Sequence, residues 1–122
     1  MSQNHYESIV ELLLPEGILE YFDITSVEHC PTNIWIFLEE RNISPKECSD
    51  DQLLSKGFLP EITVQDFPVR GKEVLYFIKR RRWYNSTKQK IVTRQWDLVN
   101  EGTRMTKEFA TFLKEISRYH TD

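Results

Sequence analysis

The order of apolar and polar residues changes along the chain, and each change predicts a different element. Residues 8–14 place apolar side chains at helical spacing, and Pro15 follows them, which predicts a short N-terminal helix. Residues 21–27 and 34–38 are rich in β-branched and aromatic side chains, and the stretch 29–33 between them favours a turn. This pattern predicts two strands joined as a hairpin.

The middle of the chain predicts an irregular connection followed by further strands. Residues 41–52 are polar, include Pro45 and show no usable period, so a loop is expected there. Strands are then predicted at 61–67, 73–83 and 90–98, separated by turn-forming stretches. Together with the first hairpin they would form a mostly antiparallel sheet.

The last predicted element is an amphipathic helix that begins near Thr106, a suitable N-cap residue, and ends near Tyr119. Its apolar stripe consists of Phe109, Phe112, Leu113 and Ile116. We expect this stripe to pack on the sheet and to close the core beneath the basic hairpin formed by the strands predicted at 73–83 and 90–98. The sequence thus predicts a single α+β domain over residues 1–122, with about five strands, a short N-terminal helix and an amphipathic C-terminal helix.

Composition narrows the class of protein. The chain has 122 residues, 39% of them hydrophobic, which suffices for one buried core. It contains no run of about 18 apolar residues, and its N-terminus carries acids where a secretory signal would carry basic residues. Cys30 and Cys48 are the only cysteines, too few for a disulfide scaffold. We therefore expect a cytoplasmic protein that neither spans nor contacts a membrane.

Charge is distributed unevenly, although the formal net charge is only −3. Residues 1–69 contain three basic and thirteen acidic residues, whereas residues 70–122 contain thirteen basic and six acidic ones. A net negative charge argues against nucleic acid as a partner, because proteins that neutralise phosphates usually carry a basic surface. The local excess of positive charge in the second part restores that possibility.

The strand predicted at 73–83 carries most of this positive charge. Both of its faces are apolar up to Ile78 and basic from Lys79 onward, as expected for a strand that leaves the core and projects into solvent. Arginine and lysine interleaved with Tyr84 and Trp96 would suit phosphates and unpaired bases. The residues predicted to contact DNA are Arg70, Lys72, Lys79, Arg80, Arg81, Arg82, Trp83, Lys88, Lys90 and Arg94. The alternatives are an acidic protein partner and a solvated edge that resists sheet aggregation.

The other reactive side chains form no recognisable catalytic or metal-binding motif. His29 and Cys30 are neighbours, but a zinc site needs about four placed ligands and the sequence has no C-x-x-C, so a turn is the simpler interpretation. The adjacent carboxylates at 39–40 and 50–51 point in different directions and are expected to be solvated. We therefore expect no enzymatic activity, no cofactor and no metal.

Three stretches in a fixed order resemble a known family. They read LSKGF at 54–58, VQDFPVRGKEV at 64–74 and KRRRW at 79–83. They resemble the N-terminal region of bacterial insertion-sequence transposases of the ISL-three type, which carry an S-x-G-aromatic step, a D-x-P-x-x-G-x-x-V turn and a basic strand end. Stand-alone N-region proteins of the ISAon-one group also share the opening LLLPEGILEYFDI and a GTRMTKEFATFLKEI-like ending, so the resemblance covers nearly the whole chain.

In many relatives of the ISL-three type this region is a zinc ribbon, with one cysteine pair before the S-x-G step and another after the basic strand. Here the first place holds only Cys48, and the second, residues 83–87, holds no cysteine. The resemblance implies a degenerate ribbon-like hairpin without metal, whose base would be held by Trp83, Trp96 and the C-terminal helix.

The family's strand transfer is performed by a separate catalytic domain, which this sequence does not include. The resemblance therefore implies a non-catalytic accessory that recognises DNA at the ends of the element. The alternative is a protein-interaction module that docks a separately encoded transposase catalytic subunit without touching DNA.

Overall fold

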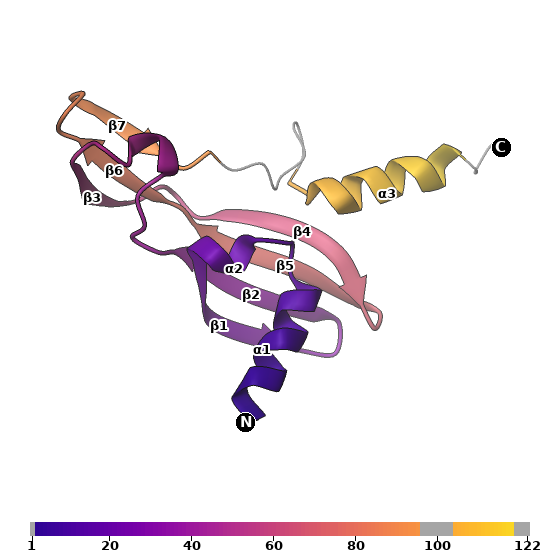
Figure 1. The fold of residues 1–122 in the computed structure, drawn as a ribbon. Helices are drawn as coiled ribbons and strands as arrows, with labels where there is room; N and C mark the ends of the chain where they lie inside the picture. Colours follow the sequence, from indigo (N-terminus) through magenta and orange to yellow (C-terminus); the bar gives the residue numbers. More distant parts are fainter. Residues whose placement is uncertain (1, 96–103, 119–122) are drawn as a thin grey trace.

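The computed structural model describes residues 2–95 and 104–118, with side chains from Ser8 onward. Figure 1 shows the helices and strands that these residues form. They are α1 (Ser2–Leu13), α2 (Ile18–Tyr21), β1 (Phe22–His29), β2 (Asn33–Glu40), a 3-10 turn η1 (Lys46–Cys48), β3 (Leu53–Phe58), β4 (Ile62–Val69), β5 (Lys72–Lys79), β6 (Arg81–Asn85), β7 (Lys90–Thr93) and α3 (Lys107–Arg118).

The strands form two sheets. Sheet A has the order β1-β2-β5-β4, and sheet B has the order β3-β6-β7. Only β2 and β5 pair in parallel, and the other pairs are antiparallel. The predicted α+β fold with a mostly antiparallel arrangement is therefore confirmed, but the described residues contain seven strands in two sheets instead of about five in one.

Two differences account for the extra strands. β3 was not predicted because its residues are almost all exposed and Gly57 sits in the left-handed region with a φ of 82°, so the stretch lacks the alternation that marks a strand. The strand predicted at 73–83 is two strands, β5 and β6. Between them the carbonyl of Arg80 accepts a hydrogen bond from the Leu59 amide at 2.7 Å, and the chain passes from one sheet to the other.

The core lies between one face of sheet A and the helices α1 and α2 (Figure 1). It contains the buried side chains Leu14, Ile18, Phe22, Leu38, Val64, Val74, Tyr76 and Ile78. The alternation of β4 and β5 accounts for this, because every second residue points to the helices. The short N-terminal helix is confirmed, although it begins at Ser2, and α2 was not predicted.

A buried polar network joins α3 to the edge of sheet A. The Tyr76 hydroxyl donates to one oxygen of Asp66 at 2.6 Å, and the Thr106 hydroxyl donates to the other at 2.8 Å. Burial and the neighbouring carboxylate both raise the pKa of Tyr76. Thr106 Oγ1 also accepts the Phe109 amide at 3.2 Å, which confirms Thr106 as the N-cap of α3.

The predicted packing of α3 is wrong in two respects. The helix packs against β4 in sheet A and lies away from the β6–β7 hairpin, so it does not close a core beneath that hairpin (Figure 1). Moreover, Phe109 and Ala110 are buried, but Phe112 is 46% exposed, and Leu113 and Ile116 are also exposed. The helix packs mainly against β4, the outer strand of the sheet, and three of the four residues of its apolar stripe face solvent.

Candidate nucleic-acid interface

The basic strand β6 is the central strand of sheet B, with β3 on one side and β7 on the other. The expectation that the basic strand projects freely into solvent is therefore wrong. One face of β6 is covered, and the other face is open. Alternation assigns Arg81, Trp83 and Asn85 to the covered face, and Arg82 and Tyr84 to the open one.

The segment 41–52 covers the inner face of sheet B. The indole N–H of Trp83 donates to Asn42 Oδ1 at 2.8 Å, and the side-chain amide of Asn85 donates to Asp51 Oδ2 at 2.9 Å. Trp83 is only 1% exposed. The expectation that its ring faces nucleic acid is therefore wrong, because the ring lies under the sheet.

Glu40 lies at the junction of the two sheets and is only 1% exposed. Its Oε2 accepts a hydrogen bond from Arg94 Nε at 2.8 Å, and its Oε1 accepts the backbone N–H of Arg81, also at 2.8 Å. The Arg94 guanidinium also lies 3.9 Å from the centroid of the Tyr21 ring and donates to the carbonyl of Ile43. Arg94 is thus a buried structural residue and was wrongly placed in the DNA-contacting set, and the predicted solvation of Glu40 is wrong for the same reason.

Arg80 and Arg81 are half-buried and hold the same junction. Arg80 Nη2 donates to the carbonyl of Arg94 at 2.5 Å, and Arg81 Nη1 donates to Ser55 Oγ at 2.6 Å. The Arg81 guanidinium also lies 4.6 Å from the centroid of the Phe58 ring. Both side chains therefore brace sheet B, and the solvent-facing position expected for Arg81 is not what the structure shows.

The outer face of sheet B carries an aromatic and aliphatic row beside basic residues. Tyr84 pairs with Leu54 on β3 and with Ile91 on β7, and residues directly opposite one another share a face. Leu54 is 57% exposed and Ile91 is 52% exposed. Arg82 is exposed next to this row, and its Nε donates to the carbonyl of Lys56 at 2.9 Å, which fixes its position beside the lysine. A half-buried tyrosine among exposed cations is a suitable platform for nucleic acid.

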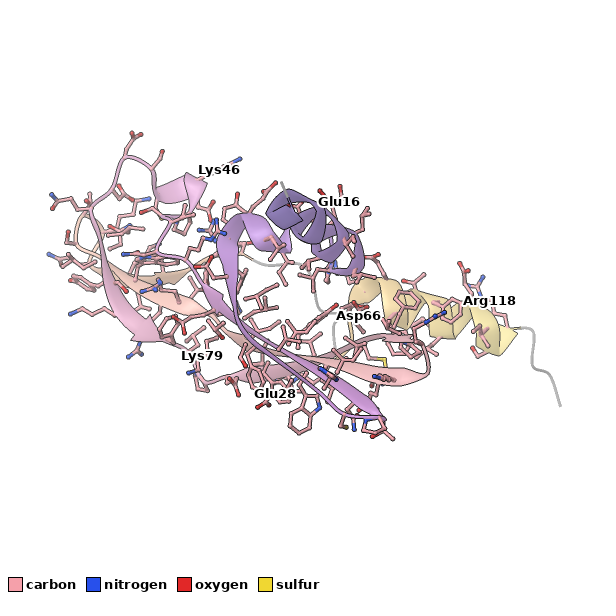
Figure 2. The ribbon with its side chains drawn as sticks, turned by 90° about the horizontal axis from the view of Figure 1, so that it is seen from below. Glu16, Glu28, Lys46, Asp66, Lys79 and Arg118 are labelled. Atoms are coloured by element: carbon pink, nitrogen blue, oxygen red, sulfur yellow. The ribbon has the colours of Figure 1, made fainter. Side chains whose placement is uncertain are left out.

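The remaining residues that were predicted to contact DNA do not lie close together. Lys88 and Lys90 are exposed at the β6–β7 turn, where Lys88 Nζ lies 3.7 Å from Asp51. Lys79 is exposed on sheet A (Figure 2). Arg70 and Lys72 lie at the β4–β5 turn. β5 and β6 lie between this turn and the β6–β7 turn, so at about 3.3 Å per residue the two turns are roughly 40 Å apart.

The two sheets differ sharply in charge. Residues 41–58 and 80–95, which build sheet B and its cover, contain nine basic and three acidic residues, a formal charge of +6. Residues 2–40 and 59–79, which build sheet A, α1 and α2, contain three basic and eleven acidic residues, a formal charge of −8, and residues 104–118 with α3 add four basic and two acidic ones. We call these parts the basic lobe and the acidic lobe. The uneven distribution of charge between the two parts of the sequence is therefore, in the structure, a difference in charge between two lobes.

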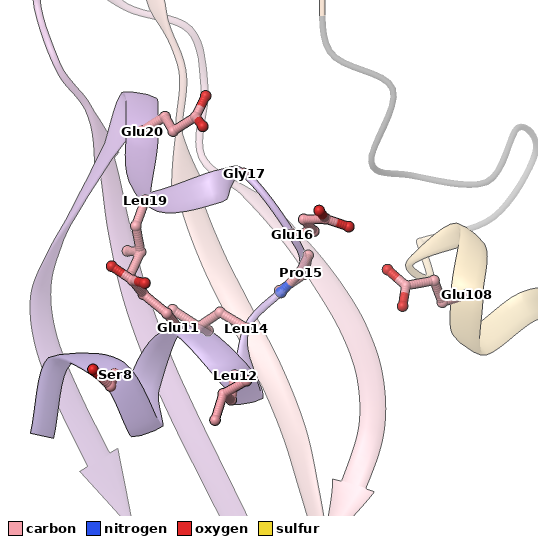
Figure 3. Close-up of a pocket in the computed structure, with 10 residues that line it drawn as sticks. All are labelled: Ser8, Glu11, Leu12, Leu14, Pro15, Glu16, Gly17, Leu19, Glu20 and Glu108. Carbon is pink, nitrogen blue, oxygen red and sulfur yellow. The ribbon is translucent and has the colours of Figure 1, made fainter. Parts of the chain in front are cut away.

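A large hollow in the described part of the chain lies on the helical side of sheet A. It is an open groove of about 750 Å³ between α1, α2 and the start of α3 (Figure 3). Its charged residues are Glu11, Glu16, Glu20 and Glu108, and its apolar residues include Leu12, Leu14, Pro15 and Leu19. No hydroxyl or thiol nucleophile lies beside a histidine base there, and among the described residues no cluster of histidine, cysteine and carboxylate side chains is suited to a metal ion.

Cys30 is an exposed free cysteine, whereas Cys48 is buried. It lies in the exposed β1–β2 turn, where the Thr32 hydroxyl lies 3.6 Å and the Asn33 amide nitrogen 3.8 Å from its sulfur. Hydrogen bonds from Thr32, with a further contribution from Asn33, lower the pKa of the thiol to about 7. His29 is its neighbour, but the described residues contain no group of three or more potential metal ligands, so the turn assigned from sequence remains the simplest interpretation.

No family model, curated protein or solved structure matches this chain. The described helices also include none that is long and apolar enough to cross a membrane.

Proposed function

We propose that the chain is a non-catalytic DNA-binding module, an accessory of insertion-sequence transposition that recognises the ends of the element in the cytoplasm. The basic lobe is its contact surface. The phosphate contacts come from the exposed cations Lys56, Arg82, Lys88 and Lys90, while Tyr84 offers an aromatic surface to a base or sugar.

The separation of charge between the lobes is the observation that carries this proposal. A protein with a net charge of −3 has no general reason to attract a polyanion, but a lobe of +6 that lies apart from a lobe of −8 presents a local positive field. Several cations of this lobe form no ion pair with an acidic side chain among the described residues. Lys56, Arg82 and Lys90 are exposed, and Arg82 donates only to a backbone carbonyl.

The resemblance to the ISL-three type gains support from the interior of the basic lobe. The family carries its two cysteine pairs at places that correspond here to Cys48 and to residues 83–87. The structure brings these places together, because Asn85 Nδ2 lies 4.0 Å from Cys48 Sγ and donates to Asp51. Asn85 Oδ1 also accepts the Lys88 amide at 3.0 Å. Hydrogen bonds thus hold the two segments, and a single cysteine does not fit the four-ligand zinc site of the family.

Titration of a fluorescent duplex that carries the element's terminal repeat, at several salt concentrations, tests the proposal. If about four phosphates are contacted, the logarithm of the association constant should fall with the logarithm of salt concentration at a slope of about −4. Arg82→Gln/Lys90→Gln should reduce that slope by about 2 units. The terminal repeat should bind more tightly than a scrambled duplex of equal length.

Arg70→Gln/Lys72→Gln is the matched control, since it removes the same charge at the far end of sheet A. It should leave both the affinity and the slope nearly unchanged. An equal loss in both double variants would show that binding responds only to net charge. A flat salt response of the parent would instead favour the alternative, a module that docks the transposase catalytic subunit without DNA contact.

A further inference from the structure

Among the described residues, no element covers the face of sheet A opposite α1 and α2. In the described part of the chain, α1 and α2 cover the other face and α3 lies beside β4 (Figures 1 and 2). Apolar side chains occupy the two central strands of the open face. Phe37 on β2 pairs with Phe77 on β5, and Trp35 pairs with Leu75 one step along. The chain thus leaves four large apolar side chains in the middle of a sheet with no described element over them.

The aromatic side chains of this face are held in a fixed arrangement. The Phe37 and Phe77 rings are stacked with centroids 4.8 Å apart, and Trp35 meets Phe77 edge-on at 5.5 Å. Trp35 is 39% exposed and the two phenylalanines are partly exposed. Exposed apolar clusters with a polar border usually mark protein-binding sites, and preorganised aromatic residues carry much of the energy of such interfaces.

The border of the face is acidic. A hollow of about 190 Å³ beside the stacked pair is lined by Glu28, Glu39 and Glu61, with Lys79 as its only basic residue. Figure 2 shows Glu28 and Lys79 on the side of sheet A away from Glu16, which belongs to the helical side. Glu73 adds another exposed carboxylate at the start of β5. This border repels phosphate, so the face is unsuited to nucleic acid despite its aromatic residues.

We propose that this open face binds a basic and apolar segment of another protein. A lysine or arginine of the partner enters the hollow between Glu28, Glu39 and Glu61 and lies against the Phe37–Phe77 pair, where carboxylates and ring faces both attract a cation. Apolar side chains of the segment cover Trp35 and Leu75. The proposal is independent of DNA binding, because the hollow and the aromatic pair belong to sheet A, and Lys79, which lines the hollow, is not among the DNA contacts of the proposed function.

A short synthetic peptide of alternating arginine and leucine serves as the probe. At physiological salt it should shift the amide resonances of residues 26–28, 35–39, 61–65 and 75–79. Glu39→Gln/Glu61→Gln should weaken its binding by about tenfold, which corresponds to two rim ion pairs of about 0.7 kcal/mol each. Trp35→Ala, at an exposed position, should weaken it by about tenfold as well, with an unchanged denaturation midpoint.

Glu16→Gln/Glu20→Gln is the matched control, because it removes two charges from the groove on the helical side (Figure 3). It should leave peptide binding unchanged. The proposal is overturned if oligo-arginine binds as tightly as the mixed peptide, if the shifts fall in that groove, or if no peptide binds. It is also overturned if sedimentation shows a dimer that Trp35→Ala dissociates, since a second copy would then cover the face.

Discussion

At the scale of single residues, Glu40 is the side chain on which the junction between the sheets depends. Its two oxygens join Arg94 and the backbone of Arg81, and Arg81 in turn donates to the Glu40 carbonyl at 3.3 Å. A buried charge that has lost its partner lowers the stability of the fold. The ion pair therefore affects stability mainly when one of its two partners is removed. The junction therefore depends on an ion pair that the sequence presents as two unrelated surface charges.

Replacement of Glu40 by alanine should lower the free energy of unfolding by about 3–5 kcal/mol, because the Arg94 guanidinium would remain buried without its partner. Urea denaturation measures this loss. The matched control is Glu39→Ala, whose side chain belongs to the open face of sheet A and should cost less than about 1 kcal/mol. Equal effects of the two substitutions would contradict the assignment of Glu40 to the junction.

At the scale of elements, the sequence predicts well where alternation is regular and poorly where contacts are distant. The strands β1, β2, β4 and β5 and the capped helix α3 follow from local patterns, and each lies close to its predicted range. The passage of the basic strand from sheet A to sheet B cannot be predicted from local patterns. It depends on pairing of β6 with β3 and on the hydrogen bond from the amide of residue 59. For the same reason Trp83 and Arg94 were placed on the surface: their burial depends on the cover formed by residues 41–52, which has no period of its own.

The apolar stripe of α3 is another case in which a local pattern does not predict burial correctly. It gives a second prediction. The stripe predicts that all its members are buried, yet Phe109 is 7% exposed and Phe112 is 46% exposed. Both rings contact Phe67, with centroids 5.2 and 5.3 Å away. Phe109→Ala should therefore lower the free energy of unfolding by about 3–5 kcal/mol, whereas Phe112→Ala should lower it by about 1 kcal/mol. A urea melt of each variant compares them, and a larger loss for Phe112→Ala would show that α3 packs differently.

At the scale of the whole molecule, the two lobes give the protein a strong electrical asymmetry. Under the proposed function the acidic lobe would repel DNA and the basic lobe would attract it, so the approach of the molecule to DNA would be oriented. The reach of this effect depends on salt, since the Debye length is about 8 Å at physiological ionic strength and about 30 Å at 0.01 M. The lobes are separated along the β5–β6 run, so at physiological salt only the nearer lobe acts on a bound phosphate.

Neutralising the groove of the acidic lobe should therefore change the rate of DNA association only at low salt. Glu11→Gln/Glu16→Gln/Glu20→Gln raises the formal net charge from −3 to zero without touching the basic lobe. Stopped-flow measurements at about 0.01 M salt should show association several times faster than in the parent, and no difference at about 0.15 M, because the repulsion is then screened. The corresponding aspartate variant keeps the charge and should behave as the parent at both salt concentrations. If the glutamine variant is faster at both concentrations, the carboxylates of the groove lie close to the bound DNA, and the assignment of the contact surface to the basic lobe alone is wrong.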